Sequence, residues 1–95
     1  MRLDLYLKVS RLVNRRSKAK EMCDKGLIKV NDKISKPSHA VKEGDLIEIV
    51  FFNKFLKIRV LKIPQGKNVS KKDSSLLYDI VEEKKKDFFS GDING

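Results

Sequence analysis

The chain has 95 residues, a formal net charge of +9 and a pI near 9.8. This length allows one small domain with a modest core plus a tail, and the charge points to an anionic partner. Residues 1–66 contain 16 Lys and Arg against 7 Asp and Glu, whereas residues 67–95 contain 6 of each. The basic part is also the part expected to fold, which favours a nucleic-acid-binding surface over a flexible basic arm.

Composition also excludes several classes of protein. The single cysteine, Cys23, excludes an internal disulfide and a zinc site built from several cysteines. The N-terminus lacks the apolar core of a signal peptide, and the longest nearly apolar stretch, residues 46–52, is too short to span a bilayer. We therefore expect a cytoplasmic protein with no membrane partner, no metal and no cofactor. Cys23 is expected in the core and His39 in a solvated loop, so no catalytic residue is expected.

Arginine is concentrated at one end of the chain. Four of the five arginines lie within the first sixteen residues, whereas the seventeen lysines are spread along the sequence. The planar guanidinium grips phosphate or a guanine edge with two parallel hydrogen bonds. The clustered arginines therefore favour a nucleic-acid-binding site, and the alternative interpretation is a chance cluster of arginines on a solvated face.

Two helices are predicted in this region. Residues 3–13 place apolar side chains at helical spacing, and Asn14 is the expected end of the first helix. Asp4 is expected to pair with Lys8, to favour the helix N-terminus, or to orient an arginine. A second, short helix is expected between Ser17 as its N-cap and Gly26 as its left-handed C-terminal residue.

After Gly26 the apolar period changes to two. Strands are expected at residues 27–30, 33–34, 46–50 and 55–61, with a tight turn at Asn31-Asp32 and another at Asn53-Lys54. We expect an α+β fold in which two short helices pack on a small, mostly antiparallel sheet. Residues 1–63 would form this domain, and residues 64–95 a polar linker and tail, with a short helix over residues 76–87.

The order of these features resembles the RNA-binding domain first described in ribosomal protein S4. The resemblance covers residues 2–62: an Arg-Leu-Asp start, the basic corner Arg15-Arg16-Ser17, Gly26, Ile28-Lys29-Val30-Asn31, and the segment Val41-Lys42-Glu43-Gly44-Asp45. Within this class, the start Met-Arg-Leu-Asp and the run Leu7-Lys8-Val9-Ser10-Arg11-Leu12 are similar to the small stand-alone RqcP-like (YabO) family. That family is related to the heat-shock protein that binds free large ribosomal subunits.

The resemblance implies a role in ribosome-associated quality control. Proteins of this family bind large subunits that carry a stalled peptidyl-tRNA, contact the large-subunit rRNA and the peptidyl-tRNA, and work with RqcH during template-independent alanine tailing. The implied protein is a cytoplasmic, ribosome-associated monomer with no enzymatic activity.

The family motif also implies which residues contact RNA. Matched by position, they are Arg2, Lys8, Arg11, Arg15, Arg16, Lys18 and Lys20, with the N–H groups near Arg2 and Ser17 as further donors. Leu5 and Asn14 stand where a basic residue is common in the family. The turn reads Asn31-Asp32 instead of Asn-Gly, which weakens the hairpin preference.

Three other functions compete with this one. A general large-subunit assembly or heat-stress factor would have the same domain. An RNA-modifying enzyme is disfavoured because some thirty residues beyond the domain cannot build a catalytic fold. A DNA-architectural role would require a preference for duplex DNA over structured RNA.

Overall fold

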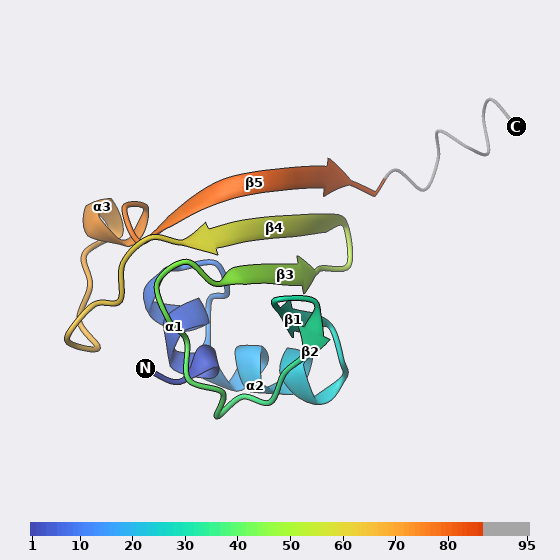
Figure 1. The fold of residues 1–95 in the computed structure, drawn as a ribbon, viewed down its shortest axis with the longest axis horizontal. Coiled ribbons are helices and arrows are strands. Elements are labelled where there is room, and N and C mark those ends of the chain that lie inside the picture. The colour runs from blue at the N-terminus through green and yellow to red at the C-terminus, as the bar shows by residue number, and fades with distance from the viewer. Residues whose placement is uncertain (87–95) are drawn as a thin grey trace, which may run out of the picture.

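Two helices pack on one face of a five-stranded antiparallel sheet, whose strand order is β2-β1-β3-β4-β5 (Figure 1). The computed structural model describes residues 1–86. The helices are α1 (Leu3–Val9), α2 (Arg16–Asp24) and the short α3 (Lys71–Ser74). The strands are β1 (Ile28–Val30), β2 (Lys33–Ile34), β3 (Leu46–Val50), β4 (Lys54–Val60) and β5 (Tyr78–Lys85). The expected α+β class is confirmed, with every strand pairing antiparallel.

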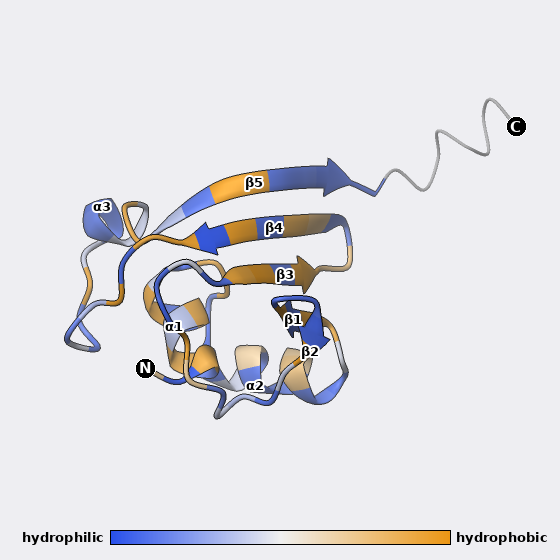
Figure 2. Cartoon of the chain, in the orientation of Figure 1, coloured by the Kyte–Doolittle hydropathy of each residue, from blue (hydrophilic) through white to orange (hydrophobic). Residues whose placement is uncertain are grey.

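The core lies between α1, α2 and the sheet face that they cover. Alternation along β4 buries Leu56, Ile58 and Val60 and leaves Arg59 exposed on the opposite face. Figure 2 shows this alternation along β4 and the mostly apolar β3 beside it. Tyr6 of α1 is fully buried, and its hydroxyl donates to the Leu77 carbonyl at 2.7 Å. The N-terminal helix is thereby fixed to the segment that leads into β5.

The first helix ends four residues earlier than the apolar spacing predicts. It stops at Val9 because Arg11 adopts a left-handed conformation, with φ of 62°, and its N–H donates to the Lys8 carbonyl at 3.0 Å. This conformation usually requires glycine or asparagine. The expected end at Asn14 is therefore wrong, since no glycine in the sequence marks the true position.

The second helix begins one residue before the predicted cap. Arg15 is the N-cap, without a side-chain hydrogen bond, and Ser17 lies inside the helix. The C-terminal prediction is confirmed: Gly26 has a φ of 72° and its N–H donates to the Cys23 carbonyl. Ala19, Met22 and Cys23 form the buried stripe, as expected.

The tight turn between β1 and β2 is also confirmed. Asn31 and Asp32 have φ values of 51° and 70°, so both central residues are left-handed, as in a type I′ hairpin. The Asn31 side chain donates to Asp45 at 3.1 Å and accepts the Leu46 N–H at 3.0 Å. These bonds join the turn to the start of β3, which helps Asn-Asp to serve where Asn-Gly is usual.

The predicted helix over residues 76–87 is wrong, because Tyr78–Lys85 form the edge strand β5 beside β4. The pairing brings opposite charges face to face, with Lys57 against Glu82 and Arg59 against Asp79. Cross-strand pairing outweighs the helical spacing of a few apolar side chains. Asp87, the last residue of the predicted helix, lies outside the described residues.

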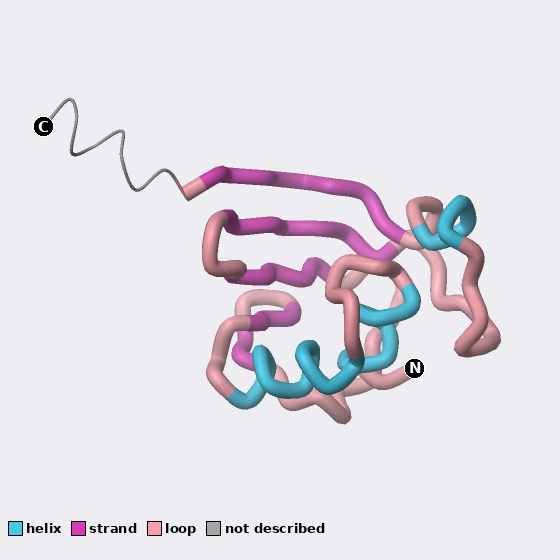
Figure 3. Tube along the Cα trace, turned by 180° about the vertical axis from the view of Figure 1, so that it is seen from behind, coloured by secondary structure: helices cyan, strands magenta, loops and turns pink. Residues whose placement is uncertain are grey.

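The segment between β4 and β5 contains α3. Ser70 caps this helix by accepting the Asp73 N–H at 3.1 Å. Figure 3, seen from behind, shows α3 beyond one end of β4 and β5, at the same end of the sheet as α1. Within residues 1–86, no helix has the length and apolar character needed to cross a membrane.

Candidate nucleic-acid interface

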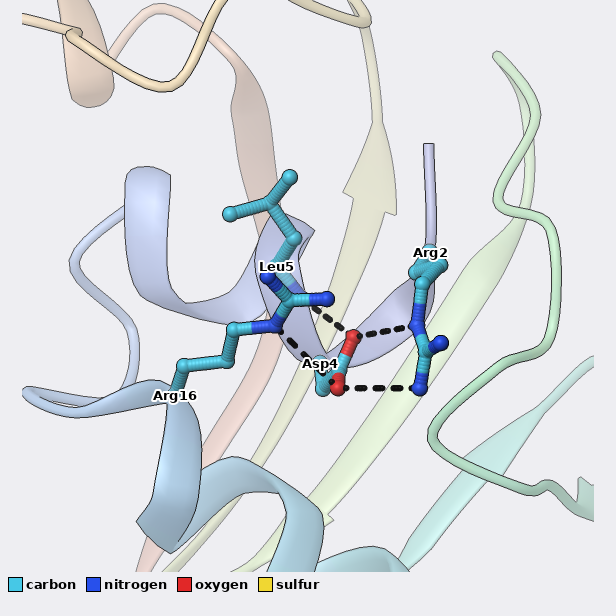
Figure 4. Close-up of polar contacts among 4 residues, drawn as sticks. All are labelled: Arg2, Asp4, Leu5 and Arg16. Atoms are coloured by element: carbon cyan, nitrogen blue, oxygen red, sulfur yellow. Dashed lines mark hydrogen bonds and ion pairs between the residues drawn. The ribbon is translucent and has the colours of Figure 1, made fainter.

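Asp4 is an acidic side chain buried at the start of α1, and it brings two arginines together. Its side chain is only 4% exposed. Arg2 Nε lies 3.2 Å from Oδ1 and Arg2 Nη2 lies 3.4 Å from Oδ2, while Arg16 Nε lies 3.3 Å from Oδ2 (Figure 4). The Leu5 N–H also donates to Oδ1, at 2.8 Å. Two of the three expected roles of Asp4 are observed: it orients arginine, and its carboxylate lies in the first turn of α1, where it accepts a backbone N–H. Lys8 makes no ion pair with Asp4 in residues 1–86.

Arg2 and Arg16, named here the arginine pair, remain accessible despite these contacts. Their side chains are 49% and 41% exposed. Two guanidinium groups share one carboxylate, so Arg2, Asp4 and Arg16 together keep a net charge of +1. Each guanidinium also has further N–H donors that can point toward solvent. A guanidinium fixed on one side loses less rotamer entropy when it binds a phosphate. The arrangement therefore suits a folded polyanion.

The loop before β3 holds the first turn of α1 in place. The Leu3 N–H donates to the His39 carbonyl at 2.8 Å and the Asp4 N–H to the Pro37 carbonyl at 3.1 Å. The Leu5 N–H donates to Asp4, so the backbone donors near Arg2 that were expected to contact RNA already have partners within the protein. Binding at this end must come from side chains. His39 itself is exposed in this loop, as expected.

Lys8 and Arg11 lie together at the other end of α1. They line a hollow of about 340 Å³ between the turn after α1 and the segment before α3, named here the corner hollow. Lys67 and Lys71, which were not among the predicted RNA contacts, line it as well. They lie more than fifty residues further along the chain, in a segment with no net charge, so composition alone gave no signal for them.

The remaining predicted contacts lie on α2. Arg15, Lys18 and Lys20 are all exposed. On a helix of 3.6 residues per turn, Lys20 falls beside Arg16, whereas Lys18 falls on the far side of the buried stripe. There Lys18 lies 3.7 Å from Glu21 and lines a hollow beside Phe51 and Phe52. Lys20 can therefore extend the arginine pair, but Lys18 belongs to a different flank of the helix.

Two groups on α2 have shifted pKa values. Burial, and then the charges of Asp4 and Asp24, raise the pKa of the Cys23 thiol to about 11. The thiol therefore stays protonated at neutral pH, which fits the predicted core role. The hydrogen bond from Lys25, followed by the charges of Lys18 and Lys25, lowers the pKa of the exposed Glu21. Within residues 1–86, no three potential metal-ligating side chains gather in one place.

Comparison with known protein families agrees with this geometry. Residues 1–47, which contain α1, α2 and the first hairpin, match the S4 domain family. Two helices with basic residues on and beside them, packed against a small antiparallel sheet, together with this match define a protein of the S4 RNA-binding class.

Curated relatives show to which family within the S4 class this chain belongs. An RQC P-site tRNA stabilizing factor of Streptococcus pneumoniae is 47% identical over 83 residues, which cover 87% of this chain and 92% of the relative. The factor of the same name in Bacillus subtilis is 41% identical over 85 residues, or 90% and 96% of the two chains. This chain belongs to the family of RQC P-site tRNA stabilizing factors.

Solved structures support the fold. Heat Shock Protein 15 of Vibrio cholerae, described as trimeric, has a TM-score of 0.77 and 27% identity, over 85% of this chain and 81% of that one. The solution structure of a hypothetical protein, HP1423, has a TM-score of 0.75 and 35% identity, over 86% and 98% of the two chains. The resemblance of the N-terminal residues to the RqcP-like family, and its relation to a heat-shock protein, are thereby confirmed.

Proposed function

We propose that this chain is a non-catalytic RNA-binding factor of ribosome-associated quality control. It binds large ribosomal subunits that carry a stalled peptidyl-tRNA, and it contacts both the rRNA and that tRNA. The names of its relatives support a role at P-site tRNA. The structural observation that carries the proposal is the arginine pair, two half-exposed guanidinium groups positioned by one buried carboxylate.

The proposed contact surface joins three groups of cations on and beside α1 and α2. The arginine pair binds phosphate oxygens, Arg15 and Lys20 extend the surface along α2, and Lys8 and Arg11 extend it at the C-terminal end of α1 and the turn that follows. Folded RNA is read mostly through its shape and backbone, which suits cations that are fixed on rigid elements. With roughly four to six phosphate contacts, log affinity should fall with log salt at a slope of about −3 to −5.

A role in alanine tailing would follow from the same binding to peptidyl-tRNA. A factor that holds peptidyl-tRNA on a split large subunit keeps the nascent chain available for extension. We propose that this chain acts as a monomer and supports RqcH-dependent alanine tailing in that way. Omission of the chain from a reconstituted tailing reaction, followed by addition of wild-type protein or Arg16→Ala, tests this step.

The RNA-binding surface is tested by co-sedimentation with large ribosomal subunits. Arg16→Ala should weaken association at least tenfold at 0.1 M salt, since it removes an oriented guanidinium. Arg59→Ala is the matched control, because Arg59 is an exposed arginine on the sheet face away from the helices. Equal losses for the two variants would contradict a localised surface.

One alternative has a specific observation behind it. The fold similarity to Heat Shock Protein 15 favours a general large-subunit assembly or heat-stress factor with the same domain. The two roles differ in their preferred target. Stronger association with peptidyl-tRNA-bearing large subunits than with empty ones supports quality control, and a preference for empty subunits supports the alternative.

A further inference from the structure

The corner hollow brings together cations from two distant parts of the chain. Four of its lining side chains are Lys8 and Arg11, from the end of α1, and Lys67 and Lys71, from the segment around α3. The other lining residues are Asn14 and three valines, so no acidic side chain lines it. Its volume of about 340 Å³ falls at the lower end of the range of small-ligand sites.

The neutral charge of the C-terminal segment conceals this cluster. Residues 67–72 contain three lysines and no acidic residue; Asp73 follows in α3 without lining the hollow, and Asp79, Glu82 and Glu83 lie in β5. There Glu82 and Glu83 are paired with Lys84 and Lys54. The segment is therefore divided into a cationic end beside α1 and an acidic strand beside β4.

The fold holds the two halves of the hollow next to each other. Arg11 Nη2 lies 3.4 Å from the Val69 carbonyl, to which it donates, and Val69 packs against the hydrophobic core. On the far side of Val69, the Ser70 cap begins α3, which carries Lys71. Arg11 itself occupies a left-handed conformation, which is strained for a residue with a side chain. Such strain at an exposed basic position is typical of functional sites.

The charges of the hollow are not balanced within the described protein. None of the four cations makes an ion pair with a carboxylate of residues 1–86, in contrast to the arginine pair on Asp4. Like charges gathered in this way repel one another, and a bound anion relieves the repulsion. The lining therefore points to a polyanionic ligand.

We infer that the corner hollow is a second phosphate-binding site, which takes the backbone of the same RNA strand that contacts the arginine pair. The inference rests on the proposed function and extends the binding surface to Lys67 and Lys71. Lys8 lies one helical turn beyond Asp4, about 6 Å along the axis of α1, so one strand can reach both places. An acidic peptide is disfavoured because the lining contains no strand edge with which a peptide backbone could pair.

The test measures binding of the full chain to a structured RNA across a range of salt concentrations. The double variant Lys67→Glu/Lys71→Glu should bind at least tenfold more weakly at 0.1 M salt. The milder Lys67→Gln/Lys71→Gln should reduce the log–log salt slope by about 1.5, as expected when two phosphate contacts are lost. Lys84→Glu/Lys85→Glu is the control, since it changes the charge equally on exposed residues of β5. Unchanged thermal melting of each variant establishes that it folds.

The outcomes separate this inference from the proposed function. If Arg16→Ala weakens binding but the Lys67/Lys71 variants behave like the β5 control, the second site is wrong and the proposed function stands. If neither Arg16→Ala nor the Lys67/Lys71 variants weaken binding, both are wrong. A site that prefers a polyglutamate peptide, or inorganic phosphate, to the RNA strand would also overturn the inference.

Discussion

Arg2 and Arg16 share one oxygen of Asp4: Nη2 of Arg2 lies 3.4 Å from Oδ2 and Nε of Arg16 lies 3.3 Å from the same atom (Figure 4). Arg2 precedes α1 and Arg16 opens α2, so this carboxylate links the two helices as well as the two cations. An acidic residue in a basic surface normally weakens attraction to RNA. Here the Asp4 carboxylate positions the two guanidinium groups that we propose bind RNA.

Arg11 allows stability and binding to be separated. Arg11→Gly should leave the free energy of unfolding unchanged or raise it by up to about 1 kcal/mol, because glycine adopts a positive φ without strain. The same substitution should weaken RNA binding, since it removes a cation from the corner hollow. Chemical denaturation and an RNA titration measure the two effects. Arg11→Ala is the control, which should lose binding without the gain in stability, because the backbone strain of the wild type remains.

Tyr6 fixes the C-terminal segment to the core through its hydroxyl. Tyr6→Phe removes this hydrogen bond and should lower the free energy of unfolding by about 1 kcal/mol. The loss stays this small because the Leu77 carbonyl oxygen still accepts hydrogen bonds from the N–H groups of Leu61 and Lys62. Tyr78→Phe is the control, because the half-buried Tyr78 side chain makes no comparable bond in the described residues. Urea unfolding of the two variants should therefore differ, and equal losses would mean that the Tyr6 bond contributes nothing.

Cys23 makes stability depend on pH in the alkaline range. Its pKa is raised from 9.0 to about 11 in the folded chain. The folded state therefore holds the thiol proton more tightly, and this stabilisation is complete below about pH 9 and is lost as pH rises toward 11. Cys23→Ala should show a smaller fall in stability between pH 9 and 11 than the wild type. Parallel curves for the two proteins would contradict a buried, protonated thiol.

The sequence predicted the presence of both helices, the end of α2 and the first hairpin, because local signals agree with the fold there, but it misplaced the end of α1 and the start of α2. Gly26 ends α2, Asn31-Asp32 form the turn, and apolar alternation marks β3 and β4. The resemblance of the N-terminal residues to the RqcP-like family is confirmed by relatives that match most of the chain.

Two features could not be read from local pattern. Residues 76–81 place apolar side chains at helical spacing, but pairing with β4 makes Tyr78–Lys85 a strand. The one sequence signal was the alternation of Lys57 and Arg59 opposite the acidic Asp79 and Glu82. The corner hollow was hidden for another reason, since only the folded chain brings Lys67 and Lys71 beside Lys8 and Arg11.

The proposed RNA binding by the arginine pair depends on its positioning by Asp4, and substitution of Asp4 tests this proposal most directly. Asp4→Asn raises the net charge by one, yet it should lower RNA affinity about fivefold or more, because the arginine pair loses its anchor. Asp24→Asn is the control, since Asp24 is an exposed acid on α2 and its loss raises the charge equally.

The decisive measurement is the affinity of these two variants and the wild type for large ribosomal subunits at one salt concentration. We predict that Asp4→Asn binds more weakly than the wild type, while Asp24→Asn binds as well or better. If both variants bind more tightly in proportion to their added charge, the surface acts only through its net charge, and the oriented arginine pair is not what recognises RNA.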